Sequence, residues 1–255
     1  MPRYAQHFLI NRHAIESIVS ALAPAKEDVI LEIGPGKGAL TGFLVESGAR
    51  VIAVEIDPVW AEELKSRFVG KENFSVINQD ILEFKGEGIG GQVKIVGNLP
   101  YNITSPILER LCEWTFWNEA VLMVQKEVAN RLIASPGGKD FGAISVGVSL
   151  FCETERVFDL SPGSFDPPPK VFSTVVRLRR RKEPLTQEPQ AVRRVVQAAF
   201  QQRRKTLLNS LSHGLGLEKE VVRKLLTDHK ISTSERPERL SVMDFVKLGL
   251  AVKKL

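Results

Sequence analysis

The sequence is poor in the residues that build disulfide scaffolds and metal centres. Its 255 residues include only two cysteines and four histidines. Both cysteines, Cys112 and Cys152, lie within apolar segments, which indicates buried and reduced thiols. The histidines are scattered, and no cysteine or histidine pair has the spacing of a metal site. We therefore expect neither a disulfide-stapled fold nor a bound metal.

Long apolar runs are also missing. No segment approaches the length needed to cross a membrane, and Met1–Tyr4 lacks the apolar stretch of a signal peptide. With 43% hydrophobic residues the chain can still form a substantial core. These features favour a cytoplasmic protein without a membrane partner, with one sizeable domain and a smaller one. Nothing in the sequence requires a dimer, so we expect a monomer.

The net charge of +5 conceals a difference between the two parts of the chain. Residues 1–169 contain 15 basic and 22 acidic side chains, a balance of −7, whereas residues 170–255 contain 20 and 8, a balance of +12. Two basic groups stand out there, and they are Arg179, Arg180 and Arg181, and Arg203, Arg204 and Lys205. A solvated basic face would explain either group alone, but the summed charge predicts a polyanionic partner.

The most regular motif combines a strand, a glycine-rich loop and a helix. Val29–Ile33 is apolar and β-branched, Gly34–Gly38 reads GPGKG, and Ala39–Val45 has a helical pattern. Glycines let the backbone approach a ligand closely, and the start of a helix offers free N–H groups. This pattern predicts a ligand site at Gly34 and Gly36.

Acidic residues follow the next two predicted strands. Arg50–Val54 leads into Glu55 and Ile56, and Phe74–Ile77 leads to Asp80. An acidic residue about 20 positions after a glycine loop is suited to bind ribose hydroxyls, as Glu55 is here. Asp80 could accept a hydrogen bond from an adenine amine while Ile56 covers the ring. The pattern therefore indicates a nucleoside pocket.

The sequence NLPY at Asn98–Tyr101 follows another buried strand, and ligands of open α/β sheets bind at such strand ends. The Asn98 side-chain oxygen and the Leu99 carbonyl are suited to accept both hydrogens of an exocyclic amine. Pro100 stiffens the turn, and Tyr101 can stack on the ring that carries the amine. Two acceptors would draw the lone pair of the amine out of conjugation and aim it at an electrophile.

A nicotinamide site is one alternative, because Gly34, Gly36 and Ala39 also fit the dinucleotide pattern. Gly38 adds a Gly-x-Gly-x-Gly spacing, which is common where no pyrophosphate is bound. The turn that begins at Asn98 suits amine binding rather than hydride transfer. An ordinary turn or an unliganded glycine loop explains each motif alone but explains the two together poorly.

Together these motifs resemble the ribosomal RNA adenine N6,N6-dimethyltransferases of the KsgA type. The matching segments cover nearly the whole chain in order, and they are Gln6–Leu9, Glu32–Gly38, Glu55–Asp57, Gln79–Asp80, Asn98–Tyr101, Gln125–Val128, Phe165–Val171 and Phe200–Leu207. The resemblance implies four methyl transfers from S-adenosyl-L-methionine to two adjacent adenosines of 16S (small-subunit) ribosomal RNA. The products would be N6,N6-dimethyladenosines and S-adenosyl-L-homocysteine, formed late in assembly of the small subunit.

The resemblance also implies which residues contact the cofactor. Gly34 would lie against its methionine part, Glu55 would bind the ribose and Asp80 the adenine amine. His7 and Leu9 would close the pocket from the amino-terminal side. Relatives often carry Asn at the position of His7, so a main-chain contact is the more robust expectation there.

The implied catalytic group consists of Asn98, Leu99, Pro100, Tyr101 and Phe165. Asn98 would lie between the cofactor and the target adenine. Phe165, in a loop stiffened by prolines, would stack on the flipped base opposite Tyr101, although a ring that caps the core fits the same pattern.

Two other functions remain open at this stage. A large-subunit RNA methyltransferase of the macrolide-resistance type is close, although those proteins usually carry Ile where Leu99 stands. A non-enzymatic RNA-binding assembly factor with the same fold is the other, and the intact Asn98 and glycine loop speak against it.

The order of elements predicts an α/β, Rossmann-like methyltransferase domain with a mostly parallel sheet and helices on both faces. Residues 156–158 and 172–178 are expected to form two closing strands. After Glu183 only helical patterns recur, at Gln190–Gln202, Lys205–Leu211, Lys219–Asp228 and Val242–Lys253. We therefore expect an S-adenosylmethionine-binding domain at residues 1–183 and a small all-α RNA-binding domain at residues 184–255.

Overall fold

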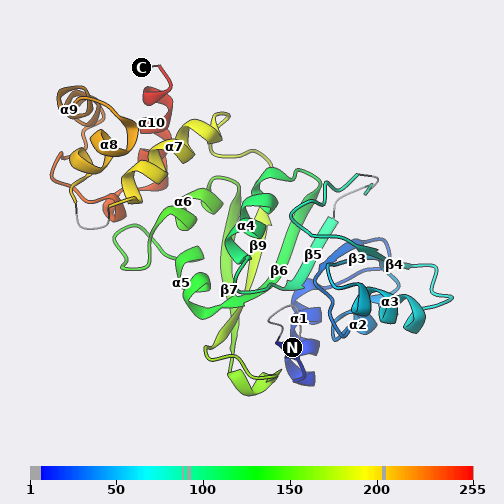
Figure 1. Ribbon diagram of the computed structural model, residues 1–255. Coiled ribbons are helices and arrows are strands. Elements are labelled where there is room, and N and C mark those ends of the chain that lie inside the picture. The colour runs from blue at the N-terminus through cyan, green and yellow to red at the C-terminus, as the bar shows by residue number, and fades with distance from the viewer. Residues whose placement is uncertain (1–6, 88, 91–92, 203–204, 255) are drawn as a thin grey trace. The chain divides into compact units, whose positions relative to one another are not determined.

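The computed structural model describes residues 7–87, 89–90, 93–202 and 205–254 (Figure 1). The chain forms two compact units, the first made of Met1–Ala129 and Thr154–Arg180, the second of Asn130–Glu153 and Arg181–Leu255. The boundary expected near Glu183 lies close to the last of these breaks. We expected Asn130–Glu153 in the first domain, but this segment belongs to the second unit. The chain passes from the first unit to the second and back again, and a single domain boundary cannot describe such a path.

The first unit is built on a seven-stranded sheet of order β4-β3-β2-β5-β6-β9-β7 (Figure 1). Its strands are β2 (Val29–Ile33), β3 (Arg50–Glu55), β4 (Phe74–Asn78), β5 (Val93–Asn98), β6 (Trp117–Gln125), β7 (Cys152–Leu160) and β9 (Ser173–Arg180). Strands β2 to β6 pair in parallel, and β9 runs antiparallel to β6. The two expected closing strands are thus confirmed as β9, inside the sheet, and β7, at its edge.

Helices connect these strands as the alternation of patterns predicts. They are α1 (Arg12–Leu22), α2 (Thr41–Glu46), α3 (Pro58–Arg67), α4 (Thr104–Glu113) and α5 (Lys126–Leu132). Two of them begin at side-chain caps: Asn11 accepts the Ala14 N–H, and Asp57 accepts the Val59 N–H. The Asp57 cap fixes the turn that directly follows Glu55.

Both faces of the sheet are buried. Ile30, Val51 and Val96 belong to one core cluster together with residues of α1 and α2. Their neighbours Leu31 and Ile52, which point to the opposite face because strand side chains alternate, are equally buried. Strands covered on both sides read as continuous apolar runs, which is why the sequence showed them clearly.

A small second sheet pairs β1 (Phe8–Leu9) with β8 (Phe165–Asp166) in antiparallel orientation. The carbonyl of Ser164, the last residue of the 3₁₀ helix η1 (Pro162–Ser164), accepts the N–H of Ile10. Strands of two residues carry no periodicity, so the sequence could not reveal this pairing. It fastens the amino-terminal segment to the loop before β9.

The second unit is helical. Its elements are α6 (Ala143–Ser149), α7 (Pro189–Phe200), α8 (Leu207–Leu215), α9 (Lys219–Asp228), the 3₁₀ helix η2 (Pro237–Arg239) and α10 (Val242–Val252). The four helices expected after Glu183 are confirmed. A core cluster joins them to Phe141, Val146 and Leu150, which explains why that earlier segment belongs to this unit. No helix in the described part of the chain is long and apolar enough to cross a bilayer.

Candidate active site

A cavity of about 380 Å³ lies at the carboxyl edge of the parallel strands in the first unit. All eight residues predicted to contact a cofactor line it, and they are His7, Leu9, Gly34, Gly36, Glu55, Ile56, Asp80 and Asn98. Leu99, Pro100 and Tyr101 line it as well. The fold thus brings together residues as far apart in the sequence as His7 and Tyr101.

The glycine loop approaches this cavity through its backbone. Gly34 and Gly36 have φ angles of +64° and +52°, in the left-handed region that favours glycine. A side chain at Gly36 would meet the ring of Phe8, with the Cβ atom only 3.0 Å from Cε1. The residue must therefore be glycine for two reasons, its conformation and the ring that covers it.

Glu55 ends β3 with its carboxylate already oriented. One oxygen accepts the Gly36 N–H and the other accepts the Asp57 N–H, both at 2.9 Å. Burial raises the pKa of Glu55, and the hydrogen bonds from Asp57 and Gly36 oppose this rise. The carboxylate joins the glycine loop to the end of the neighbouring strand and borders the cavity.

Glu32 is a buried acid in the cavity wall that sequence reasoning did not single out as a site residue. It is 1% exposed and accepts a hydrogen bond of 2.7 Å from the Thr41 hydroxyl. Burial raises the pKa of Glu32 to about 7. The Thr41 hydrogen bond lowers this pKa, and the charge of Glu55 raises it further. A charged residue inside the apolar strand Val29–Ile33 was the available signal.

This burial predicts a pH dependence of stability. The folded pKa of Glu32 is raised from 4.5 to about 7, so the folded state holds a proton that the unfolded state releases. Stability should therefore fall as pH rises from about 4.5 to about 7, by on the order of 3 kcal/mol relative to Glu32→Gln. Urea unfolding of both proteins across this range measures the difference, and parallel pH profiles would contradict the prediction.

Asn98 is held in one orientation by the amino-terminal segment. Its Nδ2 group donates a 2.9 Å hydrogen bond to the main-chain carbonyl of His7. Because the amide nitrogen is engaged, the side-chain oxygen Oδ1 is left to accept hydrogen bonds in the cavity. Gly97 makes this placement possible, since a Cβ there would lie 2.6 Å from the Ile33 carbonyl oxygen. The His7 carbonyl thus contacts Asn98, and the main-chain contact expected between His7 and the cofactor stays a prediction.

Tyr101 is the aromatic residue that ends the Asn98–Tyr101 turn and lines the cavity. Its hydroxyl lies 2.7 Å from the Ser173 hydroxyl, and its ring centroid lies 5.7 Å from that of His7. Burial raises the pKa of Tyr101, and the Ser173 hydrogen bond works in the opposite direction. The His7 ring also bonds to the Pro167 carbonyl, with 2.7 Å between Nδ1 and the oxygen. These contacts fix the position of the Tyr101 ring.

Phe165 does not share this location. Its side chain is 2% exposed and belongs to the core cluster that contains Leu9 and Leu160. It is not among the described residues that line the cavity. Phe165 thus packs in the core, which is the alternative that the sequence left open, and the stacking role expected for it stays a prediction.

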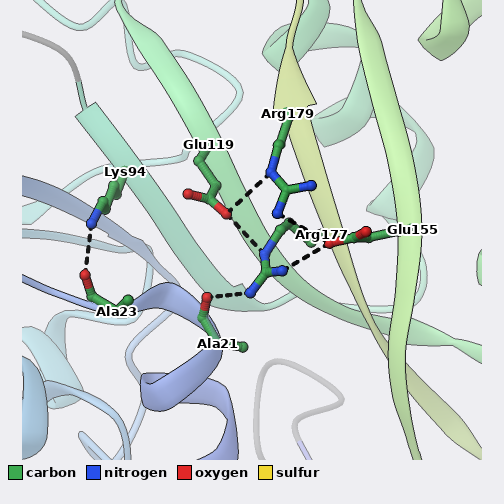
Figure 2. Close-up of polar contacts among 7 residues, drawn as sticks. All are labelled: Ala21, Ala23, Lys94, Glu119, Glu155, Arg177 and Arg179. Carbon is green, nitrogen blue, oxygen red and sulfur yellow. Dashed lines mark hydrogen bonds and ion pairs between the residues drawn. The ribbon is translucent and has the colours of Figure 1, made fainter.

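The arginines at the end of β9 have partners within the protein, as Figure 2 shows for two of them. Arg177 pairs with Glu119 and Glu155 at 2.8 Å each and donates to the Ala21 carbonyl, and Arg179 lies 3.3 Å from Glu155. Arg179 is opposite Glu119 in the register, at the sheet edge far from Asn98. This cluster fastens the end of α1 to the sheet.

Arg180 and Arg181 are engaged in the same manner. Arg180 donates to the carbonyls of Leu111 and Cys112. Arg181 donates to the Ser149 carbonyl and pairs with Glu153 at 2.7 Å. Internal hydrogen bonds and ion pairs thus hold these side chains in place, and the RNA-binding role predicted for this basic group stays a prediction.

The structure describes only one residue of the second basic group, Arg203, Arg204 and Lys205. Lys205 is exposed, and its main-chain N–H bonds to the Gln202 carbonyl. Arg203 and Arg204 lie outside the described residues. No group of side chains in the described residues has the composition and geometry of a metal site.

The cavity, the glycine loop and the mixed sheet define a class, the Rossmann-like methyltransferases. A model of the family described as "Ribosomal RNA adenine dimethylase" matches residues 1–253. The chain belongs to this family. It is accordingly an enzyme, a ribosomal RNA adenine dimethyltransferase, which removes the nicotinamide and non-enzymatic alternatives.

Individual relatives agree with this assignment. The chain is 39% identical over 259 residues to the ribosomal RNA small subunit methyltransferase A of Pseudomonas aeruginosa, with 99% of this chain and 94% of the relative covered. Its fold matches a dimethyladenosine transferase from Plasmodium falciparum, with a TM-score of 0.83, 28% identity and coverage of 97% and 98%. It also matches the 23S rRNA methyltransferase ErmE, with a TM-score of 0.73, 27% identity and coverage of 96% and 99%.

Proposed function

We propose that this enzyme methylates the N6 amines of two adjacent adenosines in 16S ribosomal RNA with S-adenosylmethionine as donor, late in small-subunit assembly. Asn98 carries the proposal, because its amide is locked by the His7 carbonyl with Oδ1 left for an adenine amine. The name of the Pseudomonas aeruginosa relative supports the small subunit as target.

The cavity fits S-adenosylmethionine in shape and charge. At Gly34, which lines the cavity, no atom lies within 4 Å of the position that a Cβ would take, and Glu55 presents a carboxylate suited to two ribose hydroxyls. Glu55 and Asp80 place two acidic side chains in the lining, which complements a ligand that carries a sulfonium and an ammonium group. Asp80 is oriented by the Leu82 N–H, and we assign it to the adenine amine.

When bound, S-adenosylmethionine supplies an electrophilic methyl group. Asn98 and the Leu99 carbonyl would accept the two hydrogens of the target amine and localise its lone pair. The turn that holds them is rigid, since the Pro100 carbonyl accepts the Thr104 hydroxyl and Leu99 donates to the Met123 carbonyl. No strong base is required, because the amine becomes acidic only after it has gained the methyl group.

The target adenine must leave its stack to reach Asn98. The Tyr101 ring, fixed through Ser173, offers a surface that offsets part of the cost. A neutral amide also suits a second methylation, since Asn98 can release the amine as its hydrogens are replaced.

The experiment that tests the function is methyl transfer from labelled S-adenosylmethionine to isolated ribosomal subunits that lack their own modifications. We expect label on two adjacent adenosines of the small subunit and none on the large subunit. Label on a large-subunit adenosine would instead support the activity named for ErmE, which has the same fold.

A separate prediction concerns the basic residues 203–205. Replacing Arg203, Arg204 and Lys205 together by Ser should weaken binding to small subunits and make the salt dependence shallower, by about 2 in the slope of log K against log[salt]. Filter binding across salt concentrations measures both. Replacing the exposed Lys65, Lys71 and Lys85 by Ser provides a matched loss of charge. Equal slopes for the parent and the 203–205 variant would show that these residues contact no phosphate.

Point variants are preferable here to removal of the chain beyond Glu183. Phe141, Val146 and Leu150 lie before that position and form part of the helical core. Truncation would expose them, and the resulting fragment would not report on RNA binding alone.

A further inference from the structure

An exposed aromatic residue lies next to the candidate active site and has no part in the function described so far. Phe172, directly before β9, is 51% exposed. The following residue, Ser173, is fully buried and bonds to the Tyr101 hydroxyl at 2.7 Å. Successive side chains of an extended segment point to opposite sides. Ser173 therefore connects the Tyr101 ring inside the site to the neighbouring Phe172 ring, which faces solvent.

Lys126 holds this second ring in place and adds a charge to it. The Lys126 main-chain N–H donates to the Phe172 carbonyl at 2.9 Å. Its Nζ lies 5.6 Å from the centroid of the Phe172 ring, within the range of a cation–π contact. An aromatic face and an ammonium group are thus presented side by side.

The ammonium group is itself positioned by a polar network. Asp159 pairs with Lys126 at 2.8 Å and with Arg156 at 3.0 Å, and it accepts the Thr174 hydroxyl at 2.7 Å. Burial raises the pKa of Asp159, but the bonds from Lys126 and Thr174 and the nearby charges outweigh it and lower the pKa. The Asp159 carboxylate thus holds the Lys126 ammonium group and the Arg156 guanidinium group in place.

Strand directions place this cluster at the same edge of the sheet as Asn98. Asn98 is opposite Met123 on β6, and Gln125 of β6 is opposite Ser173 on β9. Since neighbouring strands lie about 4.8 Å apart, two strand spacings, roughly 10 Å, separate the start of β9 from the end of β5. A nucleotide adjacent to one held at Asn98 can reach that far.

We propose that Phe172 and Lys126 form a subsite for the nucleotide next to the target adenosine, with its base stacked on Phe172 and its phosphate at Lys126. The proposal rests on the proposed function, because it takes RNA as the substrate at Asn98. A rigid exposed ring beside a cation is the combination that binds single-stranded nucleic acid, since every base offers a π face and every nucleotide a phosphate. The subsite would help to hold the RNA open around the flipped adenosine.

The test separates binding at the subsite from chemistry at Asn98. Phe172→Ala should raise KM for unmethylated small subunits about five- to tenfold, with kcat and the affinity for S-adenosylmethionine unchanged. Phe172→Tyr should restore the parental KM, whereas Phe172→Leu, which keeps an apolar side chain, should not. Val69→Ala, at a site 82% exposed, is the matched control and should behave as the parent.

Lys126→Met provides an independent variant. It should raise KM about two- to threefold and reduce the salt slope of subunit binding by about 0.7 to 0.9, one phosphate contact. A parental KM for Phe172→Ala, a full restoration by Phe172→Leu, or an unchanged slope for Lys126→Met would each overturn the subsite.

Failure of the proposed function has a different signature. A parent enzyme that labels no small-subunit adenosine would overturn the function itself. Filter binding of single-stranded RNA by the parent and by Phe172→Ala would then still test the subsite, with a loss of affinity in the variant supporting it and equal affinity overturning it.

Discussion

Asn98→Ala is expected to lower the rate of methyl transfer to small subunits by on the order of a hundred- to a thousandfold, the effect of removing one preorganised polar contact from a site of this kind. The reason is that Oδ1 of Asn98 is the acceptor fixed toward the cavity by the His7 carbonyl. The affinity for RNA should change little, because Asn98 contributes to positioning rather than to the charge that binds phosphates. Turnover and filter-binding assays on the same preparation separate the two.

Asn98→Asp tests whether the hydrogen bond to the His7 carbonyl orients the side chain at position 98. The carboxylate has nearly the same shape, but it cannot donate to the His7 carbonyl and would repel it. We expect a loss of turnover at least as large as in Asn98→Ala. Gln187→Ala, which removes an exposed amide from the second unit, serves as the matched control. Parental turnover in either Asn98 variant would refute the assigned role.

The second large effect is expected on the cofactor. Glu55→Ala should weaken S-adenosylmethionine binding on the order of a hundredfold, since a charged acceptor of two ribose hydrogen bonds is removed. It would also leave the N–H groups of Gly36 and Asp57 without their carboxylate partner. Titration calorimetry measures the affinity, with Glu46→Ala, an exposed acid of the same unit, as control.

Gly36→Val should disturb the same cavity through its glycine loop. The backbone there is in the left-handed region, and a Cβ would touch the Phe8 ring. A branched side chain should therefore displace the segment around Phe8 and abolish measurable cofactor binding. Circular dichroism must show that the sheet remains folded in both variants. Unchanged affinity in both would place the cofactor outside this cavity.

The sequence was most informative where local pattern and function coincide. The strands Val29–Ile33 and Val93–Asn98 are apolar because both faces of the sheet are covered, and their positions followed directly from that pattern. The helices after Glu183 were visible for a similar reason, their regular apolar spacing. Charge was less informative, because a run of arginines reads the same whether it meets RNA or, like Arg180, internal carbonyls.

By itself the sequence determined the class of fold, the family and the segments that border the cavity, because each of these is written in short stretches of consecutive residues. Only the tertiary structure decided that the His7 carbonyl orients Asn98, that Phe165 faces the core, and that Phe172 stands exposed beside Lys126. It alone also assigned Asn130–Glu153 to the helical unit. These features depend on contacts between residues distant in sequence, whose partners no local pattern specifies.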